Sequence, residues 1–318
     1  MPAQHRPALP KQLIADLALL LVTAIWGATF VMVKGAVQAF PVFAFLSIRF
    51  ALALLFLLPA LLWRRRAGQR NWHRPTLRAG VLVGLALFAG YAFQTFGLQY
   101  TTPAKAGFIT GLSVVMVPLF SAALLRQAPD RAAVAGVIMA AAGLALLTWQ
   151  GELTVVLGDV LVLACAVSFA MHIIALGAFS PRMDSLTLLA VQIATVMFLS
   201  LGISLLTEWP WPALPAQVLG AAAFTGAAAT TVAFGIQTVA QRFTSPTHTA
   251  LIFAMEPVWA GLFSFWLIGE RLGPRSLAGA GLILAGMLVA ELMPALWRPG
   301  AGKAIASQGS GTLDNRNI

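Results

Sequence analysis

Apolar residues occur along this chain in ten long runs, separated by short breaks that contain proline or polar residues. The runs cover residues 13–33, 41–62, 79–99, 104–125, 131–149, 157–178, 186–206, 216–238, 247–268 and 275–296. Each run has about the 20 residues that an α-helix needs to cross a bilayer. The pattern therefore predicts an all-α integral membrane protein with ten transmembrane helices.

The same pattern is written twice in the chain. Gln94 and Gln237 are 143 residues apart (237 − 94 = 143). The same offset relates Asp16 to Asp159, Thr95 to Thr238, Thr101 to Thr244, Pro103 to Pro246, Gly136 to Gly279 and Gly143 to Gly286. Because each copy holds five runs, an odd number, the second copy must enter the membrane from the opposite side. This predicts a 5+5 inverted-topology repeat, the usual build of a secondary transporter.

The boundaries of the two repeats follow from the runs. We expect the first five-helix repeat over residues 12–150 and the second over residues 155–297. The residues that follow, 298–318, are rich in Gly, Ser and Asn, which is typical of a disordered tail.

Composition agrees with a membrane protein and the charges orient it. The chain is 59% hydrophobic and 9% charged, whereas a soluble protein carries about 25% charged residues. With the N-terminus inside, 15 of the 20 Lys and Arg residues fall in inner segments, 4 in outer segments, and Arg49 in a span. The excess places both termini in the cytoplasm. The net charge of +10 is thus a topological signal, and no nucleic-acid partner is expected.

Residues that could carry enzyme or metal chemistry are sparse. Cys165 is the only cysteine, which excludes an internal disulfide and a cysteine metal cluster. The four histidines, at positions 5, 73, 172 and 248, are scattered and show no HxxxxD or HExxH spacing. A membrane-embedded lipid enzyme would need a nucleophile–base pair or a metal cluster. We therefore expect no enzyme, cofactor or metal. The expected partners are the lipid bilayer and a small-molecule substrate, and a homodimer is left open.

Several short motifs, in this order and spacing, resemble the EamA-type members of the drug/metabolite transporter superfamily over about residues 12–296. They are Trp26–Phe30, Arg49-Phe50, Thr102–Phe108, Pro118-Leu119, Gly158-Asp159, Met255–Val258, Gly269–Leu272 and Gly279–Gly286. One motif is not duplicated, since Glu270 corresponds to Gln127 in the first copy. The resemblance implies ten helices, export or exchange of small metabolites, and a bacterial inner membrane.

Two charged residues lie inside predicted spans, where a charge is expensive and is typical of a functional site. Glu256 lies about nine residues into the ninth span, or ~13 Å deep at ~1.5 Å per residue. It is predicted to bind a proton or a cationic group, unless it caps backbone freed by Pro257 or forms a fixed pair. Arg49 lies at a similar depth in the second span. It could pair with Glu256, bind a substrate carboxylate, or extend its head to the surface.

Six further residues are candidates for lining a substrate site near the midplane. Gln94 and Gln237 are the duplicated polar pair, and Tyr91 shares a helical face with Gln94. Trp26 and Phe169 are equivalent in the repeat, and His172 is the equivalent of Thr29. Each of these polar side chains could instead bond to a neighbouring helix as packing.

These features predict a secondary-active transporter that works by alternating access. The family leads us to expect export of amino acids or their derivatives. The alternatives are a multidrug exporter for lipophilic cations, with Glu256 and aromatic rings as a cation site, and the lipid enzyme considered above.

Overall fold

The helices of the computed structural model follow the apolar runs closely. The structure describes residues 11–66, 72–124, 131–148, 156–244 and 246–297. In chain order the elements are α1 (Lys11–Ala39), α2 (Val42–Arg66), α3 (Arg74–Tyr100), α4 (Pro103–Gly111), α5 (Ser113–Leu124), α6 (Arg131–Thr148), α7 (Leu157–Phe179), α8 (Ser185–Thr207), α9 (Ala216–Phe224), η1 (Thr225–Val232), α10 (Ala233–Ala240), α11 (Pro246–Phe253), α12 (Glu256–Ile268) and α13 (Pro274–Trp297). No strand occurs in these ranges.

The chain is a helical, multi-pass membrane protein. Within the described residues, seven helical segments are long and apolar enough to cross a membrane. Shorter apolar helices cover Val134–Leu144, Glu256–Ile268 and Pro274–Val289. The tail expected at residues 298–318 lies outside the described part of the chain.

Two predicted spans are broken helices. The fourth span is divided into α4 and α5 at Leu112, and the ninth is divided into α11 and α12. Pro257 explains the second break, because a proline has no N–H and its ring collides with the carbonyl four residues earlier, that of Phe253. Ser113 and Glu256 each begin the second half of their span, and they are equivalent in the repeat (256 − 113 = 143).

The eighth predicted span is also irregular, because the π-helix η1 separates α9 from α10. η1 packs on α2, where Thr231 Oγ1 donates to the carbonyl of Ala53 at 2.8 Å. A Cβ at Gly226 would lie 2.7 Å from the carbonyl oxygen of Arg49, so only glycine permits this approach. The equivalent stretch of the first repeat is regular helix in α3.

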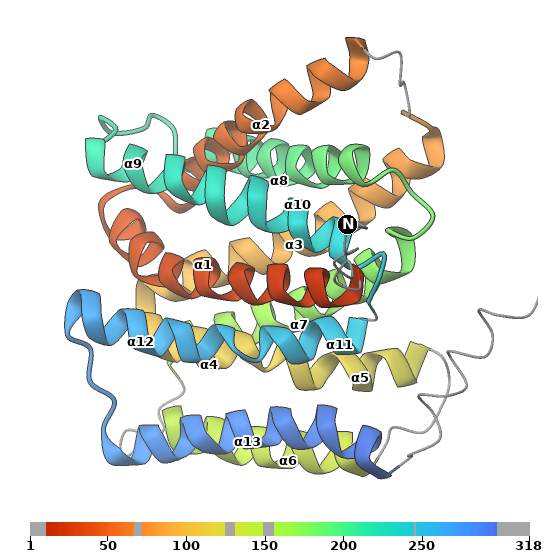
Figure 1. The fold of residues 1–318 in the computed structure, drawn as a ribbon. Coiled ribbons are helices and arrows are strands. Elements are labelled where there is room, and N and C mark those ends of the chain that lie inside the picture. The colour runs from red at the N-terminus through yellow and green to blue at the C-terminus, as the bar shows by residue number, and fades with distance from the viewer. Residues whose placement is uncertain (1–10, 67–71, 125–130, 149–155, 245, 298–318) are drawn as a thin grey trace, which may run out of the picture.

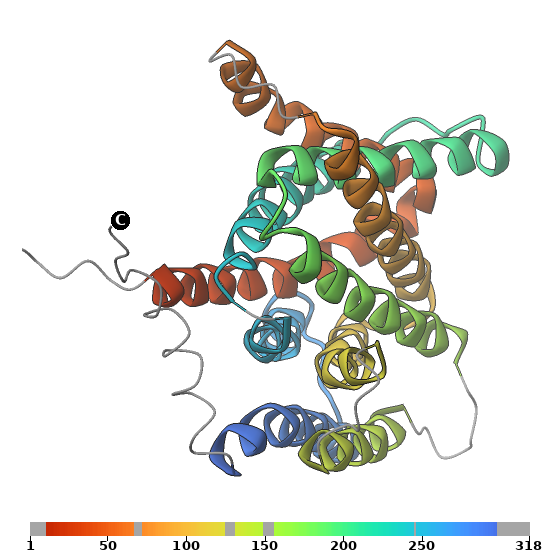
Figure 2. The same cartoon turned by 90° about the vertical axis from the view of Figure 1, so that its right-hand side faces the viewer.

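α6 and α13, the last helices of the two repeats, lie side by side at one edge of the molecule (Figures 1 and 2). Their backbones touch at two points. A Cβ on Gly279 would lie 2.6 Å from the oxygen of Gly143, and one on Gly286 would lie 2.5 Å from that of Gly136. As the residue number rises on one helix it falls on the other, so the two helices are antiparallel.

The two repeats interleave, since α3 packs on α7, α2 on α8 and α1 on α12. Acidic side chains join helix ends across the repeats. Glu208, after α8, accepts from the backbone N–H groups of Phe43 and Ala44 at 2.9 and 2.7 Å. Glu270, after α12, accepts from the N–H of Ala104 at 3.2 Å. A carboxylate at a helix N-terminus is favoured by the helix dipole.

Candidate functional site

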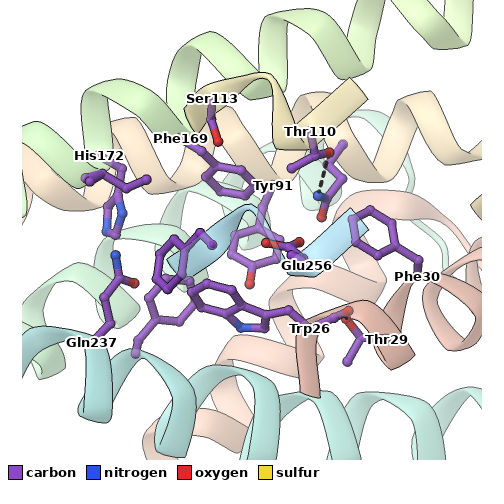
Figure 3. A pocket seen from close by; sticks show the side chains of 14 residues that line it. Trp26, Thr29, Phe30, Tyr91, Thr110, Ser113, Phe169, His172, Gln237 and Glu256 are labelled. Carbon is purple, nitrogen blue, oxygen red and sulfur yellow. Dashed lines mark hydrogen bonds between the residues drawn. The ribbon is translucent and has the colours of Figure 1, made fainter. Parts of the chain in front are cut away.

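A cavity of about 40 Å³ lies among α1, α3, α4, α5, α7, α10, α11 and α12 (Figure 3). Its lining consists of Trp26, Thr29, Phe30, Tyr91, Gln94, Thr110, Ser113, Phe169, His172, Ile173, Phe234, Gln237, Phe253 and Glu256. A water molecule needs about 10–15 Å³ of such space, so the cavity as it stands has room for only a few waters. A metabolite would require its walls to move apart.

The structure brings seven of the eight predicted site residues to this one cavity. Those seven are Trp26, Tyr91, Gln94, Phe169, His172, Gln237 and Glu256. They come from both repeats and from five helices, α1, α3, α7, α10 and α12, where Glu256 is the first residue of α12. Arg49 is the exception, because it is buried behind the wall and does not line the cavity.

Glu256 is the acidic residue of the cavity. It is the first residue of α12, where the helix dipole favours a negative charge. Within the described residues, no hydrogen bond or ion pair holds its carboxylate. In Figure 3 its two oxygens point into the space enclosed by the labelled side chains. This carboxylate is therefore free to bind a proton or a cationic group.

Arg49 neither extends to the surface nor pairs with Glu256. Its side chain is buried, with 2% of its surface exposed. The guanidinium donates from Nε to Thr230 Oγ1 at 3.1 Å and from Nη2 to the Tyr91 hydroxyl at 3.0 Å. It also lies over the Tyr91 ring, with Cζ 4.5 Å from the centroid. Neutral oxygens and an aromatic face thus take the place of a carboxylate.

His172 belongs to a hydrogen-bonded chain that leads away from the cavity. One ring nitrogen, Nε2, lies 3.0 Å from Gln192 Oε1. Gln192 in turn donates to Thr238 Oγ1 at 3.3 Å. Gln192 is the repeat equivalent of Arg49 (192 − 49 = 143). The same position therefore supports a cavity residue in both repeats, with a charge in the first and an amide in the second.

The two duplicated glutamines make different contacts. Gln94 donates to Thr110 Oγ1 at 3.3 Å, and Gln237 donates to Gln241 Oε1 at 3.1 Å. The Oε1 of Gln237 is buried without a hydrogen-bond partner among the described residues. An unpaired buried acceptor costs about 1–3 kcal/mol, so this oxygen is available to a ligand or a water. In Figure 3, Gln237 and Thr110 lie on opposite sides of the cavity.

The cavity walls are largely aromatic. The Trp26 ring lies 5.2 Å from that of Phe234 and 5.0 Å from that of Phe253. Trp26 Nε1 donates to the carbonyl of Ala229 at 2.8 Å, which fixes the indole against η1. The Tyr91 ring meets that of Phe169 edge-on at 5.5 Å.

Sequence reasoning did not select the rest of the lining. Two of these residues could have been found by applying the repeat offset, since Phe234 is the equivalent of Tyr91 and Ser113 that of Glu256. Phe253 and Thr110 are also equivalent, and they flank the two helix breaks. The breaks between α4 and α5 and between α11 and α12 were the sequence feature that would have pointed to these residues. Among the described residues, no group of three or more His, Cys, Asp or Glu is placed to hold a metal ion.

Comparisons with known proteins give one consistent answer. The sequence profile of the EamA-like transporter family matches residues 13–149 and again residues 156–291. An uncharacterized transporter of Archaeoglobus fulgidus is 36% identical over 283 residues, which are 89% of this chain and 87% of that protein. A second from the same organism is 24% identical over 280 residues, covering 85% and 95%. A solved crystal structure with 22% identity has a TM-score of 0.67 and covers 88% of this chain and 99% of its own, which shows a shared fold.

Proposed function

Since the chain belongs to the EamA-like transporter family, we propose that it is a secondary carrier that exports small amphipathic metabolites, amino acids or their derivatives first among them. The observation that carries the proposal is the cavity. Seven side chains selected for substrate contact from the sequence, drawn from both repeats, line one cavity. A site at the interface of two repeats is typical of carriers that work by alternating access.

The proposed architecture is a 5+5 inverted repeat of ten spans. It is supported by α6 and α13, which are equivalent in the repeat and run antiparallel. Their contacts cross over, because Gly143 meets Gly279 and Gly136 meets Gly286, while the offset pairs Gly136 with Gly279. A twofold axis between the helices produces this exchange. The equivalent helix breaks at Ser113 and Glu256 also support it, since broken helices commonly form carrier sites.

The proposed substrate follows from the lining. Aromatic walls suit an apolar body, and the few polar groups, among them Gln237 Oε1 and the Glu256 carboxylate, suit a polar head. In this proposal Glu256 either holds the cationic group of the substrate or takes up the proton that drives export. The proposed location is a bacterial inner membrane. In this proposal the Arg-rich segments lie on the cytoplasmic side, and so do both termini.

The test is transport in proteoliposomes. Purified protein is reconstituted, and counterflow and efflux of a panel of amino acids and related metabolites are measured with and without a pH gradient. We expect at least one member of the panel to exchange, and a pH gradient to drive its net movement. Absence of transport for the whole panel would contradict the proposed substrate class.

The Glu256→Gln variant tests the proposed coupling. The amide has nearly the same size but cannot carry the proton, so we expect the response to the pH gradient to be lost. Counterflow should persist if Glu256 serves only proton coupling, and its KM should rise if Glu256 also holds the cationic group of the substrate. Gln94→Glu is unsuitable as a control because it adds a charge to the cavity. Ser168→Ala is suitable, since its hydroxyl donates only to the carbonyl of Ala164 on its own helix. Intact pH-driven transport in Glu256→Gln would remove Glu256 from the coupling mechanism.

A second candidate is an exporter of lipophilic cations. It is favoured by Glu256 lying among Trp26, Phe234 and Phe253, since a carboxylate within an aromatic cage suits a cation. The two proposals differ over zwitterions. A cation exporter would move quaternary amines and leave amino acids behind, and the same proteoliposome assay separates the two.

A further inference from the structure

Arg49 is a full positive charge buried beside the cavity without lining it. Its contacts join the two repeats, because Tyr91 belongs to α3 and Thr230 to η1. A buried guanidinium costs several kcal/mol in desolvation. An apolar side chain would pack at this position without that cost. We therefore look for a role of the Arg49 charge in the neighbouring cavity.

The hydrogen bond to Tyr91 has a defined direction. An arginine can only donate, so the Tyr91 oxygen must accept. The hydroxyl proton must therefore point elsewhere, and no acceptor for it lies among the described residues. Tyr91 lines the cavity and its ring is held by Phe50 at 5.1 Å and Phe169 at 5.5 Å. The ring is thus held in place, and its hydroxyl proton is left to be donated to a ligand in the cavity.

Arg49 also strengthens this donor. A hydroxyl whose oxygen accepts from a cation gives up its own proton to an acceptor more readily, because linked hydrogen bonds polarise one another. The Tyr91 hydroxyl accepts from Arg49 at 3.0 Å, and Tyr91 and Glu256 line the same cavity. The cavity therefore has an electropositive donor at Tyr91 and a carboxylate at Glu256, which is the pattern that matches a molecule carrying both charges.

We propose that Arg49 determines the selectivity of the cavity through Tyr91, whose hydroxyl donates to an anionic oxygen of a zwitterionic solute while Glu256 holds its cationic group. Arg49 is a positioning residue, since it touches Tyr91 and not the solute. This inference rests on the proposed transport function. It deepens that function by naming a zwitterion as the preferred solute over the same molecule without its carboxylate.

The test compares each amino acid with its decarboxylated amine. The probes are L-leucine with isoamylamine and L-phenylalanine with phenethylamine, so each pair shares its apolar body and its amine. Counterflow in proteoliposomes gives KM and maximal rate for wild type, Tyr91→Phe, Arg49→Lys and the double variant. Tyr100→Phe is the matched control, because Tyr100 is 54% exposed at the end of α3 and does not line the cavity.

For wild type we expect the amino acids to be preferred to the amines. Tyr91→Phe should raise KM for the amino acids about tenfold, the value of one hydrogen bond to a charged group, and change KM for the amines less than about twofold. Arg49→Lys should act in the same direction, and the double variant should be no more altered in selectivity than Tyr91→Phe. Tyr100→Phe should resemble wild type. Thermal unfolding in detergent establishes which variants fold. If Arg49→Lys does not fold, Tyr91→Phe, which keeps the aromatic ring, still tests the donor to the anionic oxygen.

Two results would overturn the inference while leaving the transporter intact. One is an equal loss of amino acid and amine transport in Tyr91→Phe, which a purely structural role would give. The other is a wild-type preference for the amines. Transport of neither class by folded wild-type protein is a third, distinct result, and it overturns the proposed substrate class together with the inference.

Discussion

At the scale of single residues, the charges in this protein differ in what compensates them. Lys105 and Asp159 form a buried ion pair at 3.2 Å, and Thr101 Oγ1 donates to the same carboxylate at 2.7 Å. Arg64 and Asp184 pair at a helix end, where Asp184 is the N-cap of α8 and accepts from the N–H of Thr187 at 2.8 Å. These pairs join helices, whereas the Glu256 carboxylate faces the cavity.

The Arg64–Asp184 contact predicts a pH-dependent stability. Burial by itself would raise the pKa of Asp184, but the hydrogen bonds from Arg64 and Thr187 outweigh burial, and the pKa lies below its usual value. Because the folded pKa is the lower one, the stabilisation is complete above the unfolded value of about 3.9 and is lost as pH falls through the folded pKa. Wild type should therefore lose stability in acid more steeply than Asp184→Asn.

Two variants separate the ion pair from the helix cap. Asn caps a helix as well as Asp, so Asp184→Asn should cost less than about 1 kcal/mol, the value of a partly exposed pair. Asp184→Ala loses the cap as well and should cost about 1–2 kcal/mol. Thermal unfolding in detergent between neutral and acid pH measures both. Equal stability of the two variants at neutral pH would show that the cap contributes nothing.

At the scale of elements, helix contacts depend on small residues and cavity geometry depends on breaks. The α6–α13 contact needs glycine because its neighbours are backbone atoms. A Cβ on Gly279 would lie 2.6 Å from both the Gly143 oxygen and the Leu147 nitrogen, and neither can rotate away. Gly281, on the same helix, has nothing within 4 Å of its would-be Cβ.

This contrast gives a matched pair of substitutions. Gly279→Val should force α6 and α13 apart and cost about 1–3 kcal/mol, the usual cost of overpacking. Gly281→Val should be close to neutral, since it adds a side chain where there is open space. Detergent unfolding temperatures of the two variants check this. A similar loss for both would mean that the close approach of α6 and α13 is not what makes Gly279→Val costly, since helix propensity favours valine over glycine at both positions.

At the scale of the whole molecule, the proposed inverted repeat makes a prediction about sidedness. If the repeat is inverted, residues that are equivalent in the two copies lie on opposite faces of the membrane. Arg65 and Thr207 are both exposed near the ends of α2 and α8, one residue from equivalence (65 + 143 = 208). Single cysteines are introduced at these positions in a Cys165→Ala background.

A membrane-impermeant maleimide applied to intact cells should label Thr207→Cys directly and Arg65→Cys only after permeabilisation. The reason is the 15 to 4 excess of basic residues in the segments placed inside. Labelling of both cysteines from the same side would contradict the inverted repeat. Reversal of the two results would instead keep the repeat and invert the orientation.

How much the sequence predicted can be seen from particular residues. The membrane class and the family followed from the apolar runs and the motifs, and the family match confirms the resemblance. Glu256, Gln94 and Gln237 stood out because polar groups are rare in apolar runs. Phe234 and Phe253 did not, because an aromatic residue in a span gives no signal until its neighbours are known. Arg49 was found, but its burial and its partners were not.

The sequence by itself determined the helical, membrane-spanning character and the duplication, because hydrocarbon thickness and helical rise convert a run of apolar residues directly into a span. Tertiary structure decided which side chains share a cavity and which neutral groups surround Arg49. Those depend on contacts between residues far apart in the chain, such as the 181 positions that separate Arg49 from Thr230. No local pattern encodes such a distance, since it is set by how α2 and η1 pack.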